Sequence, residues 1–467
     1  MDQAAIHPDE AAGAGRAATR DELLRWVETI AGARAQNCFE ISGGNRCQSW
    51  GVDVAGPDGR IQPLYLRYQP PRPPSAEPYT VWREAKIYAA LRGSKVPAPR
   101  LIAIHPDVQA ILTERVAGRA EYRRIEDQRE RVTIIQEFVA ALARLHQMPL
   151  ENLDIPGLVH GASIAECVRQ ELAVWSAMYA EAGRTDALID LALGWLAHNV
   201  PNPPGLPVLV HGDAGPGNFL YEAGHMTALL DWELAHPGDP MEDLAWFSMR
   251  AVMEPVPDFA QRIREYGQMT GTAADFDRIR YHRVFVSARV VIIRHRNITG
   301  QPGNSIVSRA LNRRLLVAAL AAANDVALPA LAPMQVPPTA QTLLYDAIIA
   351  DLRHDIAANS TDGRVLAAAK NAAKVLKFLR ATDRYGQAVA RDDHAALLAL
   401  LGHRPASIEA GQAEMLTQMR RGQLSFAQVL GLFAGCVQRE ASLAAASSGG
   451  LASRLFPSLV EEHPNNV

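Results

Sequence analysis

The sequence has few cysteines, no excess of positive charge and no long uninterrupted apolar run. Its four cysteines, Cys38, Cys47, Cys167 and Cys436, lie far apart without a CxxC pair, which argues against a zinc ribbon or a disulfide scaffold. Lys and Arg number 47 against 50 Asp and Glu, and this balance argues against a globally basic nucleic-acid binder. The longest apolar stretch, 315–331, is broken by polar residues and a proline, and the first twenty residues lack a signal-peptide profile. We therefore expect a cytoplasmic protein that binds neither nucleic acid nor membranes.

The chain is too long for one ordinary domain. Its 467 residues, 48% of them apolar, suggest about three units at ~150 residues each. A proline-rich segment near residue 330 divides a longer first part from an Ala- and Leu-rich last part. We predict a flexible leader (1–20), a small lobe (21–116), a larger lobe (117–328), a linker (329–340), a helical accessory domain (341–447) and a flexible tail (448–467).

The small lobe combines strand-like and helix-like patterns. Short apolar runs between Gly- and Pro-containing turns predict strands at 38–41, 49–54, 64–68, 100–105 and 109–116. Helical spacing predicts helices at 21–33, with Asp21 as a plausible N-cap, and at 81–92. Most of the larger lobe and the accessory domain has helical spacing. The fold class we expect is α+β, with a small antiparallel sheet and mainly helical remainder.

The segment with the clearest chemical pattern is 209–220, LVHGDAGPGNFL. It brings Asp213 into a Gly- and Pro-rich loop, with Asn218 five residues later, and a second apolar run then leads to Asp231. A hairpin of short strands would bring these three side chains together. Phosphoryl transfer needs a carboxylate that positions a hydroxyl group and oxygen ligands for Mg²⁺. This set of residues at this spacing therefore predicts a kinase-type site.

The motif HGDAGPGNFLY, followed by ALLDWELAHPGDPMEDLAW, resembles the catalytic signature of aminoglycoside-phosphotransferase-like kinases, relatives of choline kinases and protein kinases. The resemblance covers roughly 25–325 and implies a bilobal, protein-kinase-like fold that uses ATP and Mg²⁺. It implies that Asp213 is the catalytic base, that His211 braces the catalytic loop, and that Asn218 and Asp231 bind Mg²⁺.

The same resemblance gives roles to three further acids. Glu233 would lie close to the metal, and Asp239 and Asp243 would tie the following helix to the catalytic loop. Each of the three also has a plain structural explanation, as a surface acid or a helix cap.

The resemblance also suggests a nucleotide side. Gly43 and Gly44 would belong to a loop over the phosphates, although a Gly-Gly turn is also an ordinary hairpin. Arg67 stands where these kinases usually have a phosphate-binding Lys, and Glu84 would be its ion-pair partner. The segment around Glu114 and Val116 resembles the hinge that meets adenine.

Local charge and a resemblance to one branch of the family indicate the type of acceptor. The stretch 278–314 has nine arginines and no acid, which suggests a local positive field suited to an anionic acceptor. The sequence also resembles kinase domains fused to certain acyl-CoA dehydrogenases, a branch that implies a hydroxyacyl-CoA acceptor and an acyl-CoA dehydrogenase partner. Alternatives are a choline-, sugar- or aminoglycoside-type kinase, or a catalytically weak nucleotide-binding regulator. The oligomeric state stays open.

Overall fold

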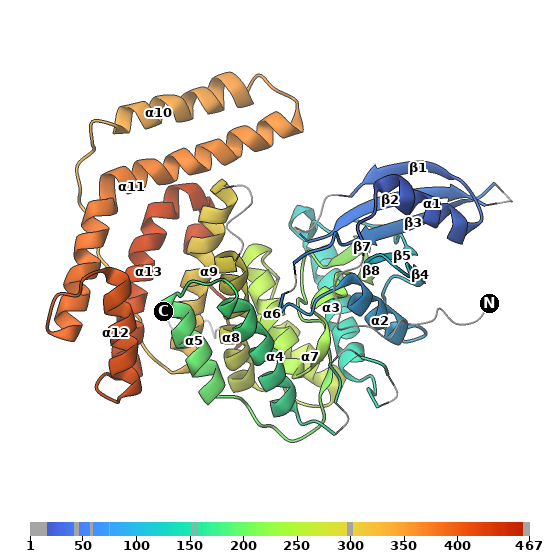
Figure 1. Cartoon of the computed structure of the whole chain (residues 1–467), viewed down its shortest axis with the longest axis horizontal. Coiled ribbons are helices and arrows are strands. Elements are labelled where there is room, and N and C mark those ends of the chain that lie inside the picture. Colours follow the sequence, from blue (N-terminus) through green and yellow to red (C-terminus); the bar gives the residue numbers. More distant parts are fainter. Residues whose placement is uncertain are drawn as a thin grey trace. The chain divides into compact units, whose positions relative to one another are not determined.

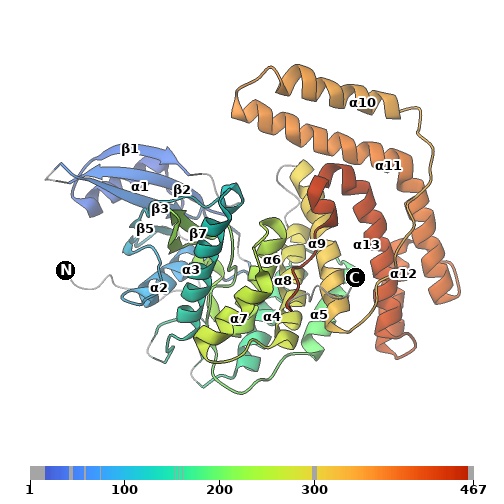
Figure 2. The ribbon, with the colours of Figure 1, turned by 180° about the vertical axis from the view of Figure 1, so that it is seen from behind.

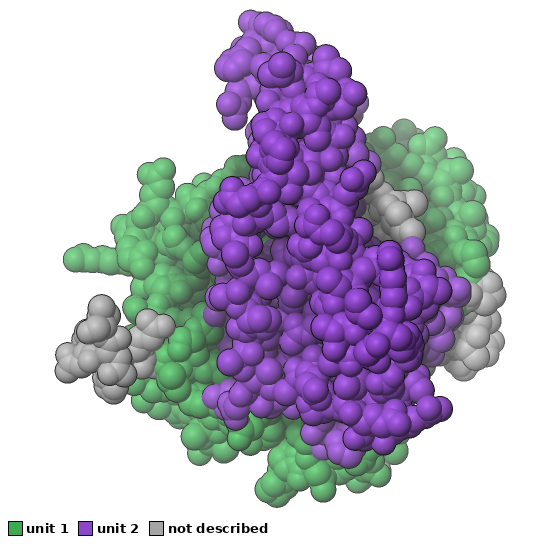
Figure 3. Space-filling view, turned by 90° about the vertical axis from the view of Figure 1, so that its left-hand side faces the viewer, with its two compact units in different colours: residues 1–174, 201–279, 457–467 green, residues 175–200, 280–456 purple. Residues whose placement is uncertain are grey.

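The computed structural model describes residues 16–41, 46–56, 59–73, 75–151, 153–155, 157–159, 161–296 and 302–460 (Figures 1 and 2). The chain forms two compact units, which Figure 3 distinguishes by colour. Unit 1 comprises 1–174, 201–279 and 457–467, and unit 2 comprises 175–200 and 280–456. No helix among the described residues is long and apolar enough to cross a membrane.

Unit 1 begins with a five-stranded antiparallel sheet of order β1-β2-β3-β5-β4. Its strands are β1 (Ala35–Glu40), β2 (Gln48–Ala55), β3 (Ile61–Tyr68), β4 (Leu101–Ile104) and β5 (Ala110–Glu114). Two helices belong to the same region, α1 (Arg20–Ala31) and α2 (Val81–Leu91). The predicted strands and helices are therefore present, and Thr19 rather than Asp21 caps α1.

Alternation along β3 assigns its side chains to two different environments. Leu64, Leu66 and Tyr68 are buried in a cluster that includes Leu23 and Val27 of α1. Since successive side chains of a strand point to opposite faces, Arg67 lies on the face away from this core. That face of the sheet is where the candidate site begins.

The remainder of unit 1 is helical except for two small antiparallel ribbons. One ribbon pairs β6 (Val208–Val210) with β9 (His236–Gly238), and the other pairs β7 (Phe219–Glu222) with β8 (His225–Leu229). The helical elements are η1 (Tyr122–Arg124), α3 (Gln128–His146), η2 (Trp232–Leu234), α6 (Pro240–Met253) and α7 (Phe259–Thr270), and α4 (Ile164–Ala180) and α8 (Phe276–Arg296) run on into unit 2.

Among its described residues, unit 2 contains helices and connecting segments and no strand. Its other elements are α5 (Ala187–His198), α9 (Pro302–Ala323), α10 (Thr342–Asp351), η3 (Leu352–Ala357), α11 (Gly363–Leu401), α12 (Ile408–Arg420), α13 (Phe426–Ser448) and η4 (Gly449–Ser453). Helix α10 runs beside the first part of α11 and has no buried residue (Figures 1 and 2). The α+β class, with a helical C-terminal region, agrees with the expectation.

The compact units divide the chain differently from the expected boundaries. Both sides of the predicted linker 329–340 belong to unit 2, in which α9 of the predicted larger lobe packs with α13 of the predicted accessory domain. Glu440 of α13 binds both Arg309 and Arg313 of α9. Such pairing between distant segments leaves no trace in composition. The expected flexible tail likewise contains the η4 turn among its described residues.

Candidate active site

The catalytic-loop motif directly follows strand β6, and a buried carboxylate holds its backbone. Asp243 of α6 accepts hydrogen bonds from the backbone N–H groups of His211 (2.7 Å) and Gly212 (2.9 Å). Gly212 has φ 78°, and a Cβ there would lie 2.3 Å from the carbonyl oxygen of Leu234. Only glycine fits this turn. The role expected for Asp243, tying α6 to the loop, agrees with these contacts.

His211 braces the loop from inside. Its Nε2 lies 2.8 Å from the carbonyl oxygen of Leu230, so Nε2 carries the proton and donates it. The other ring nitrogen, Nδ1, accepts the backbone N–H of Asp213 at 3.3 Å. A fully buried histidine thus joins the loop to the end of β8.

The β7–β8 ribbon brings the remaining motif residues next to the loop, as the spacing predicted. The side-chain N–H of Asn218 donates to the backbone carbonyl oxygen of Asp213 (2.7 Å). The backbone carbonyl oxygen of Asn218 accepts the backbone N–H of Leu230 (2.8 Å). Asp231, which follows Leu230, has the left-handed conformation (φ 65°, ψ 60°). Positive φ is strained for residues other than glycine and is common at functional sites.

Arg67 of β3 forms ion pairs with three acidic side chains of the candidate site. Its Nη2 donates to Asp231 Oδ1 (3.1 Å) and to Glu233 Oε2 (2.7 Å), and its Nε lies 3.2 Å from Glu84 Oε2. The expected ion pair of Arg67 with Glu84 is therefore present. Two nitrogens of one guanidinium, Nη2 and Nε, thus contact three carboxylates, and its planar donor geometry is not interchangeable with that of an ammonium.

Glu233 is the acid around which several arginines gather. Besides Arg67, Arg46 lies 3.4 Å from its carboxylate, and Arg83 donates to its backbone carbonyl at 3.2 Å. Arg46 also pairs with Glu77 at 3.1 Å. Arg67 and Arg46 therefore contact the carboxylate of Glu233, and Arg83 of α2 contacts its backbone.

Burial and neighbouring charge shift the pKa values of these acids in different directions. Burial, reinforced by the charges of Asp231 and Glu233, raises the pKa of Glu84 to about 7. Burial and the charge of Asp231 also raise the pKa of Glu233. For Asp231 burial acts in the same sense, but Arg67, Arg250 and His211 outweigh it and lower the pKa. This shift favours the ionised form of Asp231, the form in which a carboxylate binds a cation.

The donor atoms fit Mg²⁺. The side-chain hydrogen bond of Asn218 uses its amide nitrogen and leaves the amide oxygen for a cation, and Arg67 occupies only one oxygen of Asp231. Proteins commonly hold Mg²⁺ through one or two side-chain oxygens together with substrate phosphates. Among the described residues no group of three His, Cys, Asp or Glu side chains could hold a metal ion by itself, so the Mg²⁺ site stays a prediction.

Three of the other predicted residues have different surroundings. Glu114 is the last residue of β5 and pairs with Arg100 at 3.5 Å. Val116 precedes Ala117, whose carbonyl oxygen accepts a hydrogen bond from Thr227 of β8 (2.9 Å). Asp239 caps α6 and pairs with Arg278 (2.9 Å). Gly43 and Gly44 lie outside the described residues.

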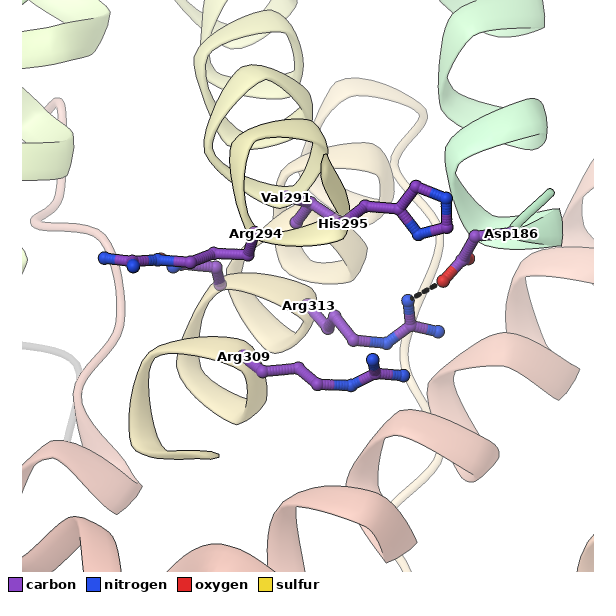
Figure 4. A pocket seen from close by; sticks show the side chains of 7 residues that line it. Asp186, Val291, Arg294, His295, Arg309 and Arg313 are labelled. Atoms are coloured by element: carbon purple, nitrogen blue, oxygen red, sulfur yellow. Dashed lines mark hydrogen bonds and ion pairs between the residues drawn. The ribbon is translucent and has the colours of Figure 1, made fainter. Parts of the chain in front are cut away.

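The arginine run does not form the open positive surface that its sequence suggested. Seven of the nine arginines contact carboxylates, aromatic rings or backbone carbonyls within the units: Arg278, Arg283, Arg289, Arg296, Arg309, Arg313 and Arg314. Figure 4 shows the pocket between α8 and α9, where Arg313 pairs with Asp186. With a volume of about 20 Å³ this pocket holds a water molecule at most.

Residues 53–282 match the sequence model of the phosphotransferase enzyme family. Over this segment the chain is therefore similar to the phosphotransferase enzyme family. Acyl-CoA dehydrogenase family member 11 of Homo sapiens is 31% identical over 201 residues, which cover 40% of this chain. The protein of that name from Gallus gallus is 31% identical over 197 residues. The matched region spans a quarter of the length of both relatives.

Solved structures of the phosphotransferase type are also similar to the chain. The aminoglycoside phosphotransferase APH(4)-Ia has 16% identity and a TM-score of 0.49, covering 65% of this chain and 98% of its own. A putative fructosamine-3-kinase from Thermobifida fusca has 19% identity and a TM-score of 0.46, covering 66% of this chain and 100% of its own.

One close neighbour of the predicted catalytic carboxylate was missed in the sequence. Arg250 of α6 donates from Nε to Asp213 Oδ1 at 2.8 Å and from Nη2 to Asp213 Oδ2. Thirty-seven positions separate the two residues, and an arginine within a helix has no local signal that marks it. The glycine at position 215 would have been the clue, since it makes room for this side chain.

Proposed function

We propose that the chain is an ATP- and Mg²⁺-dependent kinase that transfers the γ-phosphoryl group to a hydroxyl group of a small molecule. The observation that carries the proposal is the convergence of Asp213, Asn218 and Asp231 at the end of the β7–β8 ribbon, with Arg67 joining them from the sheet. Similarity to the phosphotransferase enzyme family supports the reaction class. A cytoplasmic location stays a prediction.

In this proposal each side chain has one task. Asp213 accepts the hydrogen bond of the acceptor hydroxyl and takes its proton. Asn218 and Asp231 would hold Mg²⁺, which neutralises charge on the phosphates when it is bound. When ATP binds, Arg67 would donate hydrogen bonds to phosphate oxygens in place of Asp231 and Glu233. Its buried partner, Glu84, would hold the arginine side chain in position.

The leading acceptor is a hydroxyacyl-CoA. The relatives that support it are acyl-CoA dehydrogenase family members, which match this chain over about 200 residues. The arginine run no longer supports an anionic acceptor, because most of its members have partners inside the units. An acyl-CoA dehydrogenase partner belongs to the same proposal.

The test is ATP consumption by the purified protein with Mg²⁺ across 3- and 4-hydroxyacyl-CoAs, choline, sugars and aminoglycosides, with Asp213→Asn protein as the blank. Turnover with a CoA thioester alone supports the full proposal. Turnover with another acceptor alone keeps the kinase and rejects the hydroxyacyl-CoA. ATP binding without turnover on any acceptor favours the alternative, a catalytically weak nucleotide-binding regulator.

A further inference from the structure

Helix α6 contacts the catalytic loop through two side chains on one face. Asp243 holds the loop backbone and Arg250 holds the carboxylate of Asp213. Positions seven apart on a helix are about two turns apart and lie on the same face. A single rigid element therefore fixes both the loop and its reactive group.

The loop is shaped to admit this arginine. Gly215, two residues after Asp213, has φ 142°, and a Cβ there would lie 2.7 Å from Cβ and 2.9 Å from Cγ of Arg250. Any side chain at position 215 would collide with the aliphatic part of the arginine. A Cβ at Gly217 would lie 3.5 Å from Arg250 Nη1, so the guanidinium passes along a glycine-lined part of the loop.

The guanidinium retains one nitrogen beyond the pair with Asp213. Nε and Nη2 bind the two oxygens of Asp213, whereas Nη1 makes no hydrogen bond among the described residues. The side chain is 31% exposed, so a substrate can reach it.

We propose that Arg250 is a further catalytic residue, which orients Asp213 through Nε and Nη2 and binds the transferring phosphoryl group through Nη1. This inference rests on the proposed kinase function. The acceptor oxygen forms a bond to the γ-phosphorus while the bond from that phosphorus to the bridging oxygen of ADP breaks. ADP leaves with the electron pair, and the acceptor proton goes to Asp213. Arg250 stabilises the negative charge on the phosphoryl oxygens during this step, as arginines do in other phosphotransferases.

The first experiment separates kcat from KM in Arg250→Gln and Arg250→Lys proteins, with Arg124→Gln, an exposed arginine of unit 1, as the control. We expect Arg250→Gln to lower kcat by about 10²–10³-fold, as the loss of one charge-stabilising donor does. The KM for ATP should change less than about threefold, and Arg250→Lys should recover part of the rate because it keeps the charge. Unchanged kcat in a folded Arg250→Gln protein would overturn the inference.

The second experiment adds guanidinium chloride, at a concentration that leaves the protein folded, to Arg250→Ala protein. Rescue of kcat by at least about tenfold is expected if the missing guanidinium acts on the reacting group, and a merely structural arginine would give none. Absence of rescue, together with full activity of Arg250→Lys, would show that charge alone suffices and that the Nη1 contact is wrong.

A third measurement does not need an acceptor. Binding of ADP with Mg²⁺ and aluminium fluoride imitates the phosphoryl group in transfer. Arg250→Gln should bind Mg–ADP as the wild type does and bind the fluoride complex at least about tenfold more weakly. Equal affinities would refute the role of Arg250 even if no acceptor were found. Absence of turnover in the wild type would instead count against the proposed function.

Discussion

Arg67 of unit 1 and Arg313 of unit 2 are buried to a similar degree, but their partners have different roles. The side chain of Arg67 in unit 1 is 13% exposed and that of Arg313 in unit 2 is 12% exposed, and each binds more than one carboxylate. The partners of Arg67 include Asp231, at the predicted metal site. Those of Arg313 are Asp186, which caps α5, and Glu440 of α13, so they join helices. Burial and charge are similar for the two arginines. The position of the partner carboxylates is what distinguishes an arginine of the candidate site from one that joins helices.

The largest effect is expected where the partner does chemistry. Asp213→Asn keeps the shape of the side chain and removes its ability to take a proton, so kcat should fall by about 10²–10⁴-fold. Binding of Mg–ATP, measured by calorimetry, should change little because Asn218 and Asp231 stay in place. Wild-type kcat in this variant would remove Asp213 from the mechanism. Asp154→Asn, at a 66% exposed side chain, is the matched control.

Next in size is the brace in unit 2. Arg313→Gln leaves Asp186 and Glu440 without a common cation, and removing one member of a buried ion pair costs about 3 kcal/mol. Urea unfolding followed by circular dichroism should show this loss, with no change in the affinity for Mg–ATP. If Arg313→Gln instead lowered the affinity for Mg–ATP and left the free energy of unfolding unchanged, Arg313 would act on the nucleotide site and its contrast with Arg67 would be wrong.

A smaller effect is expected at the predicted metal ligand. Asp231→Ala should weaken the Mg²⁺-dependent part of ATP binding by about 10–100-fold, because it removes an ionised oxygen donor and a partner of Arg67. Titrations with and without Mg²⁺ isolate that part. If the affinities with Mg²⁺ were the same in variant and wild type, Asp231 would not be a ligand.

The smallest effect is expected at Arg309, the exposed neighbour of Arg313. Both bind Glu440, but the Arg309 side chain is 59% exposed. Exposed ion pairs contribute little, so Arg309→Gln should lower the free energy of unfolding by less than about 1 kcal/mol. A loss as large as that of Arg313→Gln in the same urea titration would show that burial does not decide the strength of these pairs.

The sequence was informative where function depends on neighbours along the chain. The motif from His211 to Asp231 predicted the β7–β8 ribbon, because strand spacing and glycines fix such turns locally. The family resemblance likewise implied the ion pair of Arg67 with Glu84, which the structure contains. The roles of these residues in binding and catalysis remain predictions.

The sequence was uninformative where partners are distant. Residues 278–314 looked like a positive surface because their acids, among them Asp239, Glu181 and Glu440, lie elsewhere in the chain. The same reason hid Arg250, whose partner is on the catalytic loop, and the packing of α9 on α13. Periodicity reports which face of a helix is apolar, and it does not report which helix covers that face.

The most direct test of the account follows the γ-phosphoryl group itself through one turnover. Enzyme in excess over γ-labelled ATP is mixed with Mg²⁺ and a hydroxyacyl-CoA, and the label is located after quenching. The account predicts that the wild type moves the label to the acceptor hydroxyl and that Asp213→Asn leaves it on ATP. Label that stays on ATP with the wild type, or moves equally fast in the variant, would contradict it.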